Sequence, residues 1–192
     1  MSELQTPKSS CKKKFFIGIT FMFLGIIFAG GFNVALDMTN TSEFCISCHT
    51  MQKNFDELKE TTHWQNRTGV HAGCPDCHVP KAFFPKVYAK IMATKDVWHE
   101  FAGTIDTPEK YEAQRWNMAN RVWAKMEANN SRECRSCHTY THMDLSEQDR
   151  FARKKHEKAV DRDQTCIDCH KGIAHQLPEE PESTDTTEGE QL

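Results

Sequence analysis

Four copies of the pentad C-x-x-C-H contain eight of the nine cysteines in this 192-residue chain. Two thiols at this spacing can add to the vinyl groups of one porphyrin, and the adjacent histidine then lies under the iron as a ligand. The pattern therefore predicts four covalently bound haem c groups. Their cysteines would be Cys45, Cys48, Cys74, Cys77, Cys134, Cys137, Cys166 and Cys169, and the motif histidines are His49, His78, His138 and His170.

Zinc sites and redox dithiols also use pairs of cysteines at this spacing. Neither kind of site needs a histidine directly after every pair, so the histidine in all four pentads favours haem. Because the other cysteines are all in pentads, Cys11 remains alone and the chain has no set of cysteines for a disulfide framework. Haem attachment to this pentad is an export-side process in bacteria, which predicts a periplasmic domain.

The intervals between the motif histidines divide the pentads into two pairs. The step is 29 residues from His49 to His78 and 32 from His138 to His170, whereas 60 residues separate His78 from His138. Such self-similarity indicates an internal repeat. We therefore expect a small, mainly α-helical multihaem cytochrome c domain made of two di-haem halves. The porphyrins would supply apolar bulk that a chain with 38% hydrophobic residues lacks.

An uncharged apolar run, residues 15–36, precedes the first pentad. Its 22 residues would make a helix of about 33 Å, long enough to cross a bilayer core. The run is longer than a signal-peptide core and has no clear A-x-A cleavage site; a buried soluble helix is the other alternative. Because lysines directly precede the run, we expect residues 1–14 to be a cytoplasmic tail and residues 37–176 to be periplasmic, in a single-pass protein of the bacterial inner membrane.

The formal net charge of -3 is unevenly distributed along the chain. Residues 1–14 carry four lysines and one glutamate, and residues 177–192 carry six acidic residues and no basic one. The stretch between them balances to zero, so nothing suggests nucleic acid as a partner. The acidic tail of residues 177–192, which is rich in proline and threonine, should be disordered.

Cap residues and helical periodicity predict three helices in the haem domain. One covers residues 86–101. A second runs from an N-cap at Thr107 to residues 129–130. Its apolar residues at helical intervals should pack against haem faces, and they are Tyr111, Met118, Val122 and Met126. The third follows Ser146 and Asp149, which resemble a capping box.

Six histidines lie outside the pentads. A low-spin haem iron takes a second strong ligand on its other face, commonly histidine or methionine. Spacing alone does not show which of the six bind iron: His63, His71, His99, His142, His156 and His175.

The chain from about residue 30 to residue 178 resembles the NapC/NirT family of tetrahaem quinol dehydrogenases. The likeness rests on residues 30–33 (GGFN), 43–45 (EFC), 66–70 (NRTGV), 77–80 (CHVP), 105–108 (IDTP) and 166–175 (CIDCHKGIAH). It implies a membrane-anchored tetrahaem cytochrome c that oxidises menaquinol or ubiquinol. Electrons would pass to a soluble periplasmic reductase or its cytochrome subunit, with nitrate reductase as the first candidate and nitrite or N-oxide reductases as alternatives.

The resemblance also implies a crosswise arrangement of iron ligands. His175 would bind the second haem, His63 the third and His156 the fourth. This is physically reasonable, because His175 follows His170 too closely to reach the opposite face of the same porphyrin. The other three extra histidines would then be ordinary polar residues.

The first haem would be left without a distal histidine. Met51, two residues after His49, completes a C-x-x-C-H-x-M pattern found in relatives where methionine binds the iron instead of the motif histidine. The resemblance therefore implies Met51 as a ligand, and packing in a short turn is the alternative. A haem with a weak or missing sixth ligand beside the membrane is where quinol should be oxidised.

Quinol oxidation releases protons with its electrons, so it needs a proton acceptor and a group that polarises the ring oxygen. Lys90 and Asp96 resemble the lysine and carboxylate of the family's quinol site. Six positions place them about 120° apart on a regular helix, so a helix break, or a quinone between them and the haem, is required. The alternatives are an electron-transfer module without a quinol site and a multihaem nitrite or hydroxylamine reductase. The reductase is disfavoured because no pentad has lysine in place of histidine.

Overall fold

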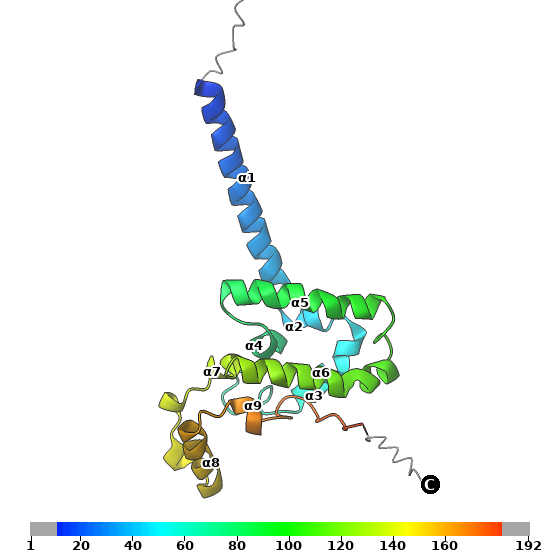
Figure 1. Cartoon of the computed structure of the whole chain (residues 1–192), viewed down its shortest axis with the longest axis vertical. Helices are drawn as coiled ribbons and strands as arrows, with labels where there is room; N and C mark the ends of the chain where they lie inside the picture. Colours follow the sequence, from blue (N-terminus) through cyan, green and yellow to red (C-terminus); the bar gives the residue numbers. More distant parts are fainter. Residues whose placement is uncertain (1–10, 182–192) are drawn as a thin grey trace, which may run out of the picture. The chain divides into compact units, whose positions relative to one another are not determined.

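The computed structural model describes residues 11–181, and the regular structure in this range consists of helices (Figure 1). The expectation of a mainly α-helical chain with one N-terminal apolar helix is confirmed. The chain divides into two compact units, one ending at Asn40 and one beginning at Thr41. This boundary lies a few residues beyond residue 37, the predicted start of the haem domain.

α1, Cys11–Met38, is the long helix of the first unit, and its stretch Lys12–Met38 is apolar enough to cross a membrane. The helix extends the predicted span of residues 15–36 at both ends. Its polar side chains can be satisfied within the helix: the Thr20 hydroxyl donates to the Phe16 carbonyl at 3.0 Å. Such a bond lets a hydroxyl lie in an otherwise apolar helix.

Both predicted tails lie partly outside the described residues. Residues 1–10 of the predicted cytoplasmic tail are not described, and residues 11–14 form the start of α1. At the other end, residues 177–181 have no regular structure, and residues 182–192 lie outside the described range. The disorder of the acidic tail therefore stays a prediction.

Two long helices frame the second unit. α5, Phe83–Phe101, begins three residues before its predicted start, and α6, Pro108–Ala128, has the predicted N-cap. The Thr107 side-chain oxygen accepts a hydrogen bond from the Lys110 amide at 3.3 Å. Pro108 occupies the first turn, where its missing N–H has no intrahelical partner in any case. Figure 1 shows α6 running back beside α5.

The other helices of the second unit are short. Four of them contain motif cysteines: α2 (Ser42–Cys45), α4 (Cys74–His78), α7 (Arg132–Arg135) and α9 (Cys166–Cys169). The rest are α3 (Gln52–Lys59), α8 (Arg150–Asp161) and the 3-10 helices η1 (His49–Met51), η2 (Tyr140–His142) and η3 (Leu145–Glu147).

The third predicted helix is present as α8, but its predicted capping box is wrong. The N-cap is Asp149, whose Oδ1 accepts hydrogen bonds from the Phe151 and Ala152 amides at 2.8 and 3.0 Å. Ser146 belongs to η3 instead, where its amide and hydroxyl both bond to Asp144. One carboxylate thus supplies the cap without help from the serine.

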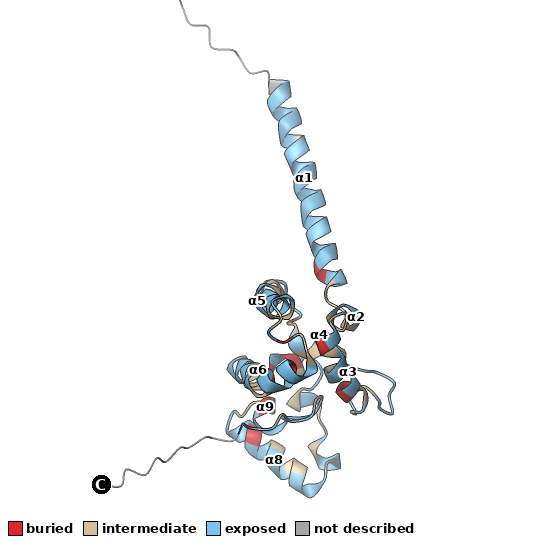
Figure 2. Cartoon of the chain, turned by 90° about the vertical axis from the view of Figure 1, so that its right-hand side faces the viewer, coloured by how far each residue is buried: buried red, intermediate tan, exposed pale blue. Residues whose placement is uncertain are grey.

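Few residues of the second unit are buried (Figure 2). The buried ones include Leu58, Ile105, Tyr111, Ala159 and Ile167. A helical unit with so thin a core leaves many side chains to pack on something else. This agrees with the expectation that porphyrins supply the missing apolar bulk.

Candidate haem-binding site

The first and third pentads share one local structure. In each, the serine before the second cysteine donates a hydrogen bond to the carbonyl three residues earlier, from Ser47 to Phe44 and from Ser136 to Glu133, both at 2.7 Å. This side-chain bond closes the turn that carries the two cysteines.

The second and fourth pentads share a different local structure. An aspartate at the same position accepts a hydrogen bond from the amide three residues earlier. The Gly73 amide donates to Asp76 at 2.9 Å, and the Thr165 amide donates to Asp168 at 2.7 Å. Because the carboxylate caps the helix start, α4 and α9 begin at their first cysteines. The alternation of the two forms supports an internal repeat.

A serine three residues before each odd-numbered pentad ties it to the pentad that follows. Ser42 Oγ accepts from the Cys74 amide at 3.1 Å, and Ser131 Oγ accepts from the Ile167 amide at 3.1 Å. The serines occupy equivalent places, but the donor differs by one position because Pro75 has no amide hydrogen. These equivalent contacts support the division into two di-haem halves.

The two halves meet where α4 contacts α7. Burial is the main cause that raises the pKa of Cys77 to about 11, and the nearby Cys134 thiol of the other half is the second cause. Within the first half, a hydrogen bond from Cys45 lowers the pKa of Cys74 to about 6 in spite of burial. Consecutive pentads therefore adjoin one another from the first to the fourth.

Three pairs of histidines that are distant in sequence come together. Each pair joins a motif histidine to one of the extra histidines, in the crosswise pattern that the family resemblance implied. The ring centroids are 6.2 Å apart for His78 and His175, 6.2 Å for His63 and His138, and 5.9 Å for His156 and His170.

This separation fits one iron between two imidazoles. A metal–nitrogen bond of about 2.0 Å plus roughly 1.1 Å from the nitrogen to the ring centre, taken twice, gives about 6 Å. A zinc site would instead need several ligands around one ion. Among residues 11–181, no group of three or more histidine, cysteine, aspartate or glutamate side chains is arranged to hold a metal ion.

The ring nitrogens of the three distal histidines are also suited to a ligand role. His63 Nδ1 and His175 Nδ1 are buried and have no hydrogen-bond partner. His156 Nδ1 lies 2.6 Å from Gln148 Oε1, an outer contact that fixes the ring and leaves Nε2 for a metal. Burial lowers the pKa of His175, which favours the neutral imidazole that binds metals.

The other extra histidines occupy different surroundings. His99 Nδ1 lies 2.8 Å from the Thr104 hydroxyl. The His71 ring packs on Trp64 with centroids 4.5 Å apart, and His142 is exposed at the end of η2. Their environments agree with ordinary polar roles.

His49 differs from the other motif histidines. Its Nε2 lies 2.7 Å from the Asp106 carbonyl oxygen and its Nδ1 lies 3.3 Å from Glu100 Oε1, and the side chain is 66% exposed. Met51 Sδ, by contrast, has only a 4.0 Å contact with Asn54 Nδ2. Because both nitrogens of His49 have protein partners, the geometry favours Met51 as the ligand of the first iron.

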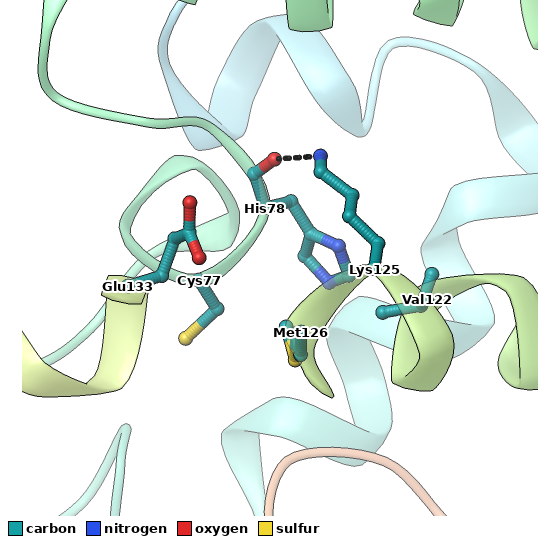
Figure 3. A pocket seen from close by; sticks show the side chains of 6 residues that line it. All are labelled: Cys77, His78, Val122, Lys125, Met126 and Glu133. Carbon is teal, nitrogen blue, oxygen red and sulfur yellow. Dashed lines mark hydrogen bonds between the residues drawn. The ribbon is translucent and has the colours of Figure 1, made fainter. Parts of the chain in front are cut away.

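A small pocket adjoins the second pentad (Figure 3). Cys77 and His78 line it together with Val122 and Met126 of α6. Lys125 Nζ donates to the His78 carbonyl at 3.4 Å, which links α6 to the pentad. Val122 and Met126 belong to the apolar positions expected to pack against haem, and both line this pocket.

No sequence pattern pointed to the buried ion pair between Arg115 of α6 and Glu57 of α3. Their side chains are 8% and 7% exposed, and Arg115 Nη2 donates to Glu57 Oε2. Glu57 also accepts the Gln176 amide at 3.0 Å, and Arg115 donates to the Gln176 carbonyl at 3.1 Å. The pair therefore holds the residue directly after His175.

α5 lies along the first pentad. Lys90 Nζ lies 5.9 Å from the centre of the Phe44 ring, and burial lowers the pKa of Lys90. Near the other end of α5, Glu100 Oε2 accepts a hydrogen bond from Thr50 Oγ1 at 2.9 Å. Asp96 is one helical turn before Glu100 and so lies on the same side. The helix is continuous between Lys90 and Asp96, so no helix break brings them onto one face.

Together, the anchor helix, the pentads and the histidine pairs define a membrane-anchored multihaem c-type cytochrome. The model of the NapC/NirT cytochrome c family, N-terminal region, matches residues 7–180, and the chain belongs to this family. Covalently bound haem c and a role in electron transport follow from that membership.

Relatives of high similarity cover most of the chain. A protein of Allochromatium vinosum named as a tetrahaem cytochrome of c type is 57% identical over 175 residues, which is 91% of this chain and 95% of the relative. The denitrification system component NirT of Stutzerimonas stutzeri is 56% identical, and the cytochrome c-type protein NapC of Escherichia coli is 51% identical. Each alignment covers 156 residues, 81% of this chain and 78% of the relative. No solved structure gives a significant match.

Proposed function

We propose that the protein oxidises quinol at the membrane and delivers the electrons to a soluble periplasmic reductase or its cytochrome subunit. Four haem c groups, when bound, supply a row of one-electron redox centres. The family resemblance points to nitrate reductase as the first candidate acceptor, and the Stutzerimonas stutzeri relative is named as part of a denitrification system. The haem domain would be periplasmic, because lysines precede the span.

For the irons we propose three histidine pairs and one methionine. His78 and His175 would serve the second haem, His138 and His63 the third, His170 and His156 the fourth, and Met51 the first. The centroid separations of 5.9–6.2 Å support the pairs.

Replacing His63, His156 or His175 by alanine should each convert one low-spin haem to high spin, because that iron loses a strong ligand. His71→Ala and His142→Ala are the controls and should leave the spin state unchanged. Electron paramagnetic resonance measures the spin state, and mass spectrometry checks that four haems remain attached. A high-spin signal in His71→Ala equal to that in His63→Ala would show that the assignment is wrong.

The placement of α5 against the first pentad is the observation that supports a quinol site. Lys90 lies at the Phe44 end of that pentad, and Asp96 lies one turn from Glu100, which contacts the other end. Ala93 is midway between them on the helix surface, and its small side chain leaves room for a ring between the two. Lys90 would polarise the quinol oxygen, and Asp96 would accept one of the two protons. The other proton would pass to water, and the two electrons would pass to the haems as the quinol becomes a quinone.

The test uses the full-length protein in liposomes, mixed with a menaquinol analogue and no other protein. We expect the quinol alone to reduce the haems. An electron-transfer module without a quinol site would stay oxidised under these conditions and still be reduced by dithionite. That result would exclude quinol oxidation by this chain.

A further inference from the structure

α5 presents a stripe of large apolar side chains to the outside. Phe84, Tyr88, Ile91 and Trp98 are 82%, 65%, 61% and 69% exposed. Intervals of four, three and seven residues place them on one face of a helix. Lys95 lies on the same face as these apolar residues, and its long aliphatic stem lets the charged amine reach water. Scattered exposed apolar residues are ordinary, but a continuous stripe of this size indicates an interaction surface.

Bound haem would not cover this outer stripe. The side of α5 that meets the first pentad carries Glu100, whose carboxylate accepts from Thr50. Glu100 is nine positions after Ile91, which is about half a turn around the helix. The stripe therefore points away from the first pentad and its porphyrin.

The chain enters the second unit directly after the anchor helix. Residues 39–41 alone connect the end of α1 to the start of α2, and the step from Met38 to Ser42 spans at most about 14 Å. Phe44 of α2 lies beneath Lys90, so α5 adjoins the point where the chain enters the second unit. A link this short leaves the lipid that surrounds the anchor within reach of the stripe.

We propose that α5 lies in the plane of the bilayer surface, with Phe84, Tyr88, Ile91 and Trp98 inserted among the lipid headgroups and upper acyl chains. Aromatic residues with a lysine among them suit this zone, where one end of a side chain is apolar and the other is wet. The occupant is phospholipid. The proposal does not depend on quinol oxidation, and it leaves α8, at the opposite end of the second unit, away from the lipid (Figures 1 and 2).

The test uses the full-length haem-loaded protein in phospholipid nanodiscs that contain a lipid with a photoactivatable diazirine on its upper acyl chain. Adducts are located by peptide mass spectrometry. We expect adducts on α1 and on the stripe of α5. Phe151 of α8 is 71% exposed and serves as the control, because an equally exposed aromatic residue away from lipid should stay unlabelled.

A double substitution of Phe84→Gln and Trp98→Gln should strongly reduce the α5 adducts and keep those on α1, with the spin states of the four haems unchanged from the parent. Phe151→Gln should change neither set of adducts. An unlabelled α5 in the parent protein would overturn the proposal, as would labelling of Phe151 equal to that of the stripe. Burial of the stripe in a dimer of this chain, without lipid adducts, would overturn it as well.

Discussion

Replacing Asp96 by asparagine should slow the reduction of the haems by quinol ~10²–10⁴-fold, the usual contribution of a general base. Asparagine keeps the size and hydrogen-bonding capacity of the side chain but cannot take up the quinol proton. Reduction by dithionite should be unchanged, because dithionite delivers electrons without a quinol. Stopped-flow mixing of a menaquinol analogue with the oxidised protein in liposomes measures both rates.

The controls separate chemistry at Asp96 from a general effect of charge. Asp161→Asn removes an exposed carboxylate at the end of α8 and should leave the quinol rate unchanged. Lys90→Ala should weaken quinol affinity, and Lys90→Arg should weaken it less because arginine keeps the charge. If Asp96→Asn is reduced at the parent rate, Asp96 is a solvated helix charge and another group accepts the proton.

Features with a local chemical cause were predictable from sequence. The apolar run of α1 and the Thr107 cap of α6 each depend on neighbouring residues alone, and both helices form where expected. The predicted capping box of α8 was wrong because Ser146 and Asp149 both offer a capping oxygen within one short segment. The pattern does not show which oxygen captures the amides, and the charged one, favoured by the helix dipole, does so.

The ligand pairs could not be derived from spacing, because each one joins segments that only the tertiary fold brings together. The motif histidines were evident, but the pairing of His63 with His138 rested on family resemblance until the structure brought the rings together. The ion pair of Glu57 and Arg115 could not be recognised in the sequence, because 58 residues separate the two charges. Each of them resembles an ordinary charged residue on a helix surface. Only the packing of α3 against α6 makes them a buried unit.

Arg115→Ala should lower the free energy of unfolding by about 3–5 kcal/mol, because it leaves the buried Glu57 carboxylate without its partner. The arginine also donates to the Gln176 carbonyl at 3.1 Å. Its loss should therefore loosen His175, and one haem should show a high-spin fraction before the domain unfolds. Urea unfolding in detergent, followed by helical circular dichroism, measures the first effect, and electron paramagnetic resonance measures the second.

Lys110→Ala is the matched control on the same helix. Lys110 pairs with Asp106 at 2.7 Å, but both side chains are well exposed, and such a pair contributes less than about 1 kcal/mol. Combining Arg115→Met with Glu57→Leu should restore most of the stability, because neither charge is then buried alone. The high-spin fraction should persist in that double variant, since Gln176 has lost both of its polar partners. If Arg115→Ala unfolds at the same urea concentration as Lys110→Ala, the buried pair does not stabilise the domain and does not hold His175.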